Sequence, residues 1–130
     1  MKKIIVAFYI ATTLILGVNT QIVSAETKTS ATSTLDIVAT AYAPGPHDNG
    51  KWGNLTYMGT KVRPGIIAVD PKIIPLGSKV RIDFADGRTV EAIAEDTGGA
   101  IKGNRIDIAM QTVSEAYKFG MQKVKVTVLE

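Results

Sequence analysis

The chain has 130 residues, a net charge of +3, a single histidine and no cysteine. This length suits one domain with its own hydrophobic core. The lack of cysteine excludes disulfides, iron–sulfur clusters, thiolate zinc sites and cysteine nucleophiles, and one histidine excludes any site that needs two. Carboxylates are therefore the obvious reactive groups, and we expect neither a metal nor a cofactor.

The first 25 residues have the order of a secretory signal peptide. Lys2 and Lys3 precede an uncharged apolar run over 4–18, and the small side chains of Val23 and Ala25 suit cleavage after Ala25. An uncleaved membrane anchor is the alternative, since about 20 apolar residues can span a bilayer. Without the two lysines the net charge is +1, so we expect a secreted protein that does not bind nucleic acid.

The Thr- and Ser-rich residues 26–34 predict a polar linker, which leaves 35–130 as the folded unit. Six segments of this unit have the alternating or continuous apolar pattern of short strands. They cover residues 35–40, 66–69, 79–84, 89–94, 105–109 and 124–129. The expected inward-facing side chains in three of them are Val80, Ile82 and Phe84; Val90, Ala92 and Ala94; and Val124, Val126 and Val128. Asp86-Gly87 predicts a hairpin, and 44–59 predicts a long loop.

One helix is expected after the fifth strand. Thr112 and Glu115 have the spacing of a capping box, and Gly120 is placed to end the helix. Val113, Ala116 and Tyr117 form its expected apolar stripe. Six strands and one two-turn helix favour a small closed barrel, because closure leaves no exposed sheet edge.

Residues 95–110 (EDTGGAIKGNRIDIAM) are the least ordinary part of the chain. Three glycines mark a loop, Asp96 ends the strand before it, and Asp107 lies within the strand after it. Because Asp107 alternates with Ile106 and Ile108, it points toward a cleft if those two residues face the core. Apolar neighbours disfavour a charged carboxylate, so the pattern indicates an acid that keeps its proton at neutral pH.

Two other interpretations of this loop are weaker. A P-loop needs Lys and then Ser or Thr after its last glycine, whereas Lys102 precedes Gly103 here. Asp96, Thr97 and Gly98 match the motif of an aspartic-protease half, which would act as a dimer. Only 34 residues follow Asp96, too few to complete such a half, so the aspartic-protease-like dimer is a remote alternative.

The segment DTGGAIKGNRID over 96–107 resembles the signature of the three-aspartate (3D) domain. This module is shared by the membrane-bound lytic transglycosylase A family and small muralytic proteins of Gram-positive bacteria. Upstream, AVDPKIIPLGSKVRI over 68–82 resembles the family's other block, with Asp70 as its first aspartate. The resemblance covers 35–130 and implies an all-β fold with one short helix, a six-stranded double-psi β-barrel.

The resemblance also implies a reaction in the cell wall. Family enzymes cleave the β-1,4 bond between N-acetylmuramic acid and N-acetylglucosamine in peptidoglycan glycan strands. The muramyl 6-hydroxyl attacks its own C1 and gives a 1,6-anhydro end. Because the substrate supplies the nucleophile, one acid/base group can replace the usual pair of glycosidase carboxylates.

By the same resemblance, Asp107 is the catalytic acid/base. Asp96 and Asp70 are implied supporting carboxylates that raise the pKa of Asp107 or hydrogen-bond the sugar. For Asp70, which precedes Pro71, capping of a turn is the alternative.

Other positions of the signature are implied to bind substrate. Lys102 would contact the sugar or stabilise charge on the leaving group, with a solvated position as the alternative. The residues that would shape the loop are Thr97, Gly98 and Gly99.

The chain departs from the family pattern after the last aspartate. Family members commonly carry an aromatic pair there, where this chain has Ala109 and Met110. Trp52 and Tyr57 are candidates for the sugar platform instead, unless they fold back over the end of the barrel. A non-catalytic glycan-binding module is therefore the competing function.

Overall fold

The computed structural model describes Gly17 and residues 32–130 of the chain. Apart from Gly17, the predicted signal peptide lies outside the described residues, as does most of the predicted linker. The six strands are β1 (Thr34–Tyr42), β2 (Ile66–Val69), β3 (Lys79–Phe84), β4 (Thr89–Asp96), β5 (Arg105–Ala109) and β6 (Gln122–Val128). Two helices, α1 (Pro46–Asn49) and α2 (Val113–Phe119), and the 3-10 turn η1 (Gly50–Trp52) complete the domain.

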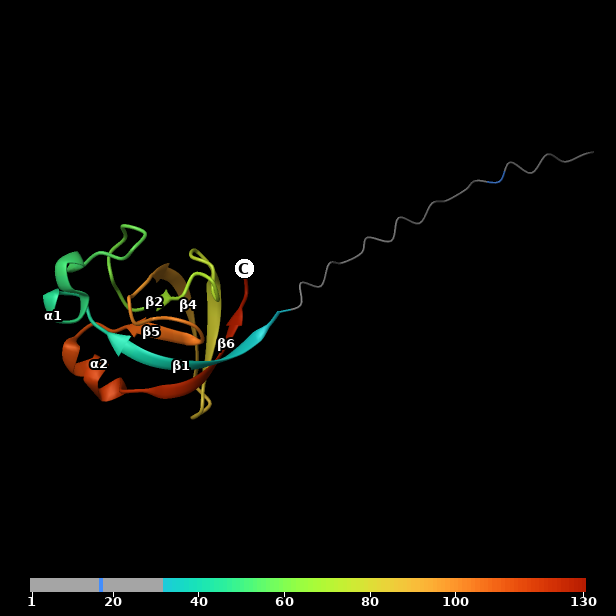
Figure 1. Ribbon diagram of the computed structural model, residues 1–130. Helices are drawn as coiled ribbons and strands as arrows, with labels where there is room; N and C mark the ends of the chain where they lie inside the picture. The colour runs from blue at the N-terminus through green and yellow to red at the C-terminus, as the bar shows by residue number, and fades with distance from the viewer. Residues whose placement is uncertain (1–16, 18–31) are drawn as a thin grey trace, which may run out of the picture.

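The strands close into one barrel in the order β1-β5-β2-β4-β3-β6, with β6 pairing back onto β1 (Figure 1). The β1–β5 and β2–β4 pairs are parallel, and the other four pairs are antiparallel. This arrangement confirms the predicted six-stranded double-psi β-barrel. Neither parallel pair joins strands that are consecutive in the chain, so each pair is connected through other strands of the barrel.

The barrel interior is filled by aliphatic side chains that alternate along the strands. Ile67, Val69, Val80, Ile82, Ile106 and Val126 are each 0% exposed. A second, smaller cluster lies on the other face of β2 and β5 and contains Tyr42, Val62, Ile66, Ala68, Ile101 and Ala109. The second cluster matters for function because the candidate site is built beside it.

The predicted hairpin is confirmed, because Phe84 N–H donates to Arg88 O at 2.9 Å across the Asp86-Gly87 turn. The predicted set of inward-facing side chains was wrong at one position. Val90 is the second residue of β4, next to this turn at the end of the barrel, and it is 41% exposed.

Helix α2 starts and ends as predicted. Glu115 N–H donates to Thr112 Oγ1, and Gly120, with φ +64°, ends the helix. The predicted apolar stripe was wrong at Tyr117, which is 74% exposed, because Ala116 and Phe119 turn toward the barrel instead.

The segment 44–59 is not a plain loop, since it contains α1 and η1. Both elements are too short to show a helical period in the sequence. Figure 1 shows α1 and α2 near the C-terminal end of β1. No helix in the described part of the chain has the length and hydropathy needed to cross a membrane.

Candidate functional site

The two aspartates of the signature flank a single small residue of β2. Ala68 pairs with Asp107 of β5 on one side and with Asp96 of β4 on the other. Since neighbouring strands lie about 4.8 Å apart, the Cα atoms of the two aspartates are about 10 Å apart. Ala68 itself is 3% exposed, because it is packed in the second cluster with Tyr42 and Ile101.

A bulge brings Asp96 into this row. The β2–β4 pairing places Ala94 opposite Ile67 but Asp96 opposite Ala68, so Glu95 is an extra residue in β4. Such an insertion reverses the side-chain alternation beyond it. Asp96 therefore lies beside Tyr42 of the second cluster, whereas Ala92 and Ala94 face the main core.

Asp96 is buried, with 5% exposure, and both of its carboxylate oxygens accept hydrogen bonds. Oδ1 accepts from the N–H groups of Tyr57 and Thr97, both at 2.9 Å, and Oδ2 accepts from the Tyr42 hydroxyl at 2.7 Å. Burial raises the pKa of Tyr42, and the hydrogen bond to Asp96 raises it further. Tyr42 thus remains a donor, and Asp96 is a fixed carboxylate rather than a mobile one.

Asp107 has a different environment. It is half-buried, and Thr40 Oγ1 donates to its Oδ1 at 3.0 Å. Burial raises the pKa of the Asp107 carboxyl, and the negative charges of Asp48 and Asp96 act in the same direction. The Thr40 hydroxyl and the Arg105 charge oppose the shift without cancelling it. The net effect favours a protonated acid, which is the state a proton donor needs.

Asp70 lies at the end of β2 and bonds to backbone rather than to the other aspartates. Its Oδ2 accepts from Gly103 N–H at 2.9 Å, and its Oδ1 accepts from Lys72 N–H at 3.1 Å. These two donors, led by Gly103, hold the pKa of Asp70 below its ordinary value. Asp70 therefore caps the turn after β2 and ties the glycine-rich loop to it.

The glycines of the loop 97–104 serve different purposes. A Cβ atom on Gly98 would lie 2.9 Å from Cγ1 of Ile101, so a side chain there collides with a buried residue. Gly99 has nothing within 4 Å of an added Cβ. Gly103 has φ +67°, which only glycine adopts readily, and this conformation presents its N–H to Asp70.

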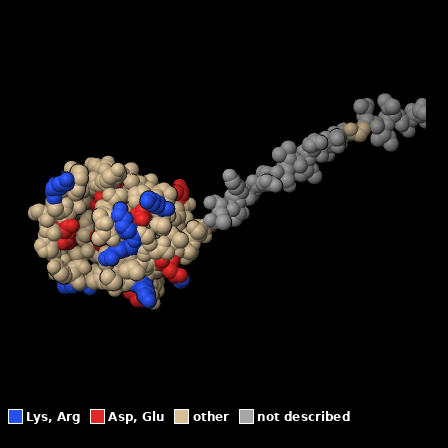
Figure 2. Space-filling view, viewed as in Figure 1, with Lys and Arg blue, Asp and Glu red and all other residues tan. Residues whose placement is uncertain are grey.

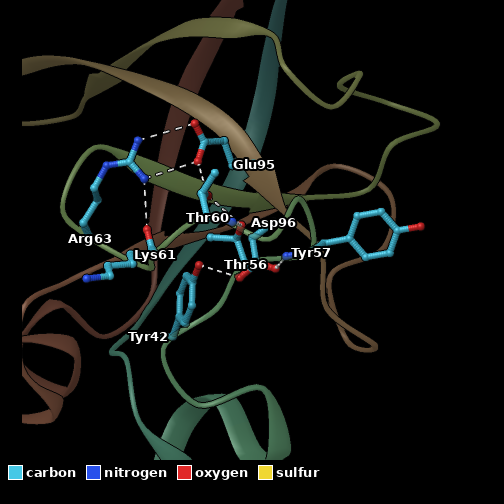
Figure 3. A network of polar contacts seen from close by, with 8 residues as sticks. All are labelled: Tyr42, Thr56, Tyr57, Thr60, Lys61, Arg63, Glu95 and Asp96. Carbon is cyan, nitrogen blue, oxygen red and sulfur yellow. Dashed lines mark hydrogen bonds and ion pairs between the residues drawn. The ribbon is translucent and has the colours of Figure 1, made fainter.

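The segment after η1 is fastened to the end of β4 by the two consecutive acids Glu95 and Asp96 (Figure 3). Glu95 accepts from the Thr60 hydroxyl and from the Arg63 guanidinium, and these contacts lower its pKa. Asp96 holds Tyr57 by its backbone N–H, while the Tyr57 ring extends away from the network. Tyr57 is 69% exposed, although its backbone is held in place by the bond to Asp96.

A pocket of about 560 Å³ opens between this segment and the glycine-rich loop. Its walls consist of Asp48, Asn49, Trp52, Tyr57, Asp96, Thr97, Gly98, Gly99 and Lys102. All the predicted substrate-binding residues therefore line one pocket, together with Asp96. Asp107 and Asp70 do not line it. Asp107 lies beside it, because only Ala68 of β2 separates it from Asp96 in the wall, whereas Asp70 bonds to Gly103 of the loop.

Sequence reasoning missed several residues of the site. Tyr42 donates to Asp96 and Thr40 donates to Asp107. Both residues lie on β1, and no local sequence motif predicts these contacts. Asp48 lines the pocket from α1 and accepts from Ala43 N–H at 2.9 Å. The signal that could have drawn attention to Asp48 is the short polar stretch after Pro46, which places an acid in the first turn of α1.

On the face seen in Figure 2, Lys and Arg side chains are interspersed with Asp and Glu and separated by uncharged surface. Among residues 32–130 no group of His, Asp and Glu side chains is arranged to hold a metal ion.

Fold and site together define a small double-psi β-barrel with a carboxylate-walled pocket beside a glycine-rich loop. The chain belongs to the 3D domain family, whose sequence profile matches residues 65–130. This match confirms the resemblance drawn from the signature.

Two curated relatives come from Bacillus subtilis (strain 168). Cell wall-binding protein YocH is 39% identical over 120 residues, which is 87% of this chain and 39% of YocH. Putative cell wall shaping protein YabE is 50% identical over 64 residues, which is 49% of this chain and 15% of YabE. The chain spans less than half the length of the curated relatives it matches.

Solved structures share the barrel. The crystal structure of MltA from E. coli aligns with a TM-score of 0.52 and 23% identity over 58% of this chain and 27% of MltA. The structure of E. coli MltA with bound chitohexaose aligns with a TM-score of 0.53 and 21% identity, over 58% of this chain and 27% of MltA. A Clavibacter michiganensis expansin mutant in complex with cellohexaose aligns with a TM-score of 0.54 and 16% identity, over 75% of this chain and 51% of the expansin chain. At these identities the likeness is one of fold.

Proposed function

We propose that the protein is a lytic transglycosylase that cleaves the β-1,4 bond between N-acetylmuramic acid and N-acetylglucosamine in peptidoglycan. The observation that carries the proposal is the environment of Asp107. Burial and two neighbouring carboxylates favour its protonated form, and it lies beside a pocket that has aromatic side chains at its rim. The names of the relatives, which bind or shape cell wall, support the same substrate.

The proposed reaction uses Asp107 twice. Its carboxyl first gives a proton to the glycosidic oxygen while the bond from that oxygen to C1 of the muramyl residue breaks. The muramyl 6-hydroxyl oxygen then forms a bond to C1, and its proton passes to the Asp107 carboxylate. The acid is restored, one strand has a new 4-hydroxyl, and the other has a 1,6-anhydro end, so no water is consumed.

The pocket walls supply binding and orientation in this scheme. Trp52 and Tyr57 are 61% and 69% exposed, and exposed aromatic rings can stack on pyranose rings. The Lys51 ammonium lies over one face of the Trp52 ring, 5.1 Å from its centroid, so we propose that the sugar stacks on the other face. Asp96, which is fixed by three donors, is suited to accept hydrogen bonds from sugar hydroxyl groups. Lys102 brings a positive charge to the same pocket, where it can stabilise charge on the leaving group. Glycan complexes of MltA and of the expansin, two proteins with this fold, support this use of the barrel.

The test is digestion of purified peptidoglycan with the full chain, followed by mass spectrometry. We expect 1,6-anhydromuramyl products from the wild type and none from Asp107→Asn. Asp86→Asn, which changes an exposed carboxylate in the β3–β4 hairpin, is the matched control and keeps full activity. Products with a reducing muramyl end would mean hydrolysis, and equal release by Asp107→Asn would exclude Asp107 as the acid.

The pH profile offers a second test of the same assignment. Asp107 must start the reaction protonated, so activity falls as pH rises through its raised pKa. Activity that keeps increasing as pH rises through the pKa of Asp107 would contradict its role as proton donor.

The second candidate is a glycan-binding module that does not cleave. The position of Asp107 beside the pocket rather than in its wall favours this candidate, as does the cell wall-binding name of YocH. Co-sedimentation with peptidoglycan separates the two. Both functions predict binding that Trp52→Ala weakens by roughly 2- to 10-fold, but only the enzyme releases anhydro products.

The site of action follows from the substrate. We propose that residues 1–25 direct the chain out of the cell and are removed, so that it acts in the cell wall during turnover of peptidoglycan. The order of charge, apolar run and small residues supports this route.

A further inference from the structure

The part of the pocket wall that carries Tyr57 is a small hairpin of residues 55–61. An isolated antiparallel bridge closes the base of this hairpin. At its tip, Gly59 N–H donates to Thr56 O at 3.0 Å, so Tyr57 and Met58 are the two central residues of the turn. Both of their side chains are exposed and gain little from burial. We therefore expect polar contacts with the barrel to hold the turn in place.

Two consecutive acids at the end of β4 supply these contacts (Figure 3). Asp96 Oδ1 accepts from Tyr57 N–H at 2.9 Å, and the backbone carbonyl of Glu95 accepts from Met58 N–H at 3.2 Å. The Glu95 side chain is 12% exposed and accepts from the hydroxyl of Thr60, on the returning arm of the hairpin. The tip and the returning arm are therefore both bonded to β4.

The hydroxyl groups inside the hairpin donate in one direction, toward Glu95. The contacts with Thr60 and Arg63 lower the pKa of Glu95, so at neutral pH it is a carboxylate that only accepts hydrogen bonds. Thr60 gives its single hydroxyl proton to Glu95, so the Thr56 hydroxyl, 2.7 Å away, must be the donor to Thr60. Thr56 in turn accepts from Thr60 N–H at 3.1 Å and is 3% exposed. This chain of hydrogen bonds ends on one carboxylate, that of Glu95.

We propose that Glu95 is a positioning residue of the glycan site, which holds Tyr57 in the pocket wall through Thr60 and the 55–61 hairpin. The inference rests on the proposed function only in that the pocket binds a glycan strand, and it does not require cleavage. Glu95 is the extra residue of the β4 bulge, a feature that often re-aims side chains next to active sites. It does not line the pocket, so it acts through Tyr57 rather than by contact with the sugar.

The experiment measures the affinity of the full chain for purified peptidoglycan by co-sedimentation. Every variant is made in the Asp107→Asn chain, so that the glycan is not consumed during the assay. We expect Glu95→Ala and Thr60→Val each to weaken binding by roughly 2- to 10-fold, and Tyr57→Ala by at least as much. When Tyr57→Ala is already present, Glu95→Ala should weaken binding by less than about 2-fold more, because the ring through which it acts is gone. Glu91→Ala is the matched control, since it removes an exposed acid and its ion pair from the same strand.

Two results would overturn the proposal. One is unchanged affinity in Glu95→Ala or Thr60→Val, with circular dichroism showing that the variant is folded. The other is an equal loss with and without the Tyr57 ring, which would assign the effect to the stability of the whole domain. Thr60→Val removes one hydroxyl at nearly constant volume, so it tests the same contact even if Glu95→Ala does not fold. Coupled losses of binding without anhydro products from the wild type would support the role of Glu95 and contradict the proposed cleavage. Anhydro products together with unchanged binding in the variants would do the reverse.

Discussion

Removal of the Tyr42 hydroxyl is the sharpest test of how the site is held together. Tyr42 and Asp96 are each 5% exposed, and the hydroxyl donates to Oδ2 at 2.7 Å. In Tyr42→Phe the Oδ1 contacts remain, but Oδ2 loses its protein donor in a place that water reaches poorly. Loss of a hydrogen bond to a buried charged group costs about 1.5–3 kcal/mol.

We therefore expect Tyr42→Phe to lower the free energy of unfolding by about 2 kcal/mol. For a domain of this size that change corresponds to a fall in Tm of about 8–16 °C. Urea and thermal unfolding followed by circular dichroism measure both quantities. Tyr117→Phe is the matched control, because Tyr117 is 74% exposed and its hydroxyl bonds to no residue in the described part of the chain. A loss below about 0.5 kcal/mol, or an equal loss in the control, would refute the reasoning.

Two further predictions concern the loop. Gly98→Ala places a methyl group 2.9 Å from Ile101 Cγ1 and should cost about 1–3 kcal/mol of stability, whereas Gly99→Ala meets nothing within 4 Å and should cost under about 0.5. Thermal melts compare them, and equal values would contradict the packing argument. Asp70 has a folded pKa below its ordinary value of 3.8, so its contribution to stability is present above pH 3.8 and is lost as pH falls through the lower folded value. Between pH 5 and pH 2 the Tm of the wild type should therefore fall more steeply than that of Asp70→Asn; parallel curves would show that Asp70 is not the group involved.

The strands were predictable because burial on one face imposes a period of two. The segments at 66–69, 79–84 and 105–109 begin and end in the structure where their apolar pattern does. The first strand extends beyond its pattern to Tyr42, since its last residues pair with β5, and pairing between distant strands leaves no mark on either segment alone.

The candidate site was predictable in composition and only partly in geometry. Alternation along β4 groups Asp96 with Ala92 and Ala94, and only the extra residue Glu95 turns it to the other face. A bulge depends on how two strands pair, so neither strand predicts it. Asp48 was missed for a related reason, since its place depends on a single backbone contact with Ala43.

The pairing of β1 with β6 has a consequence for how the domain reaches its native state. Thr34 lies opposite Thr127, and their hydroxyls are 3.0 Å apart, although 93 positions separate them along the chain. Contacts between such distant segments pay the full entropy of loop closure before they add stability, and domains rich in them fold in milliseconds to seconds. Until Gln122–Val128 is available, β1 and β3 each lack a neighbour and present unpaired edges. The closed barrel is therefore an all-or-none product of the complete domain, and shortening β6 should leave an aggregation-prone chain rather than a smaller stable one.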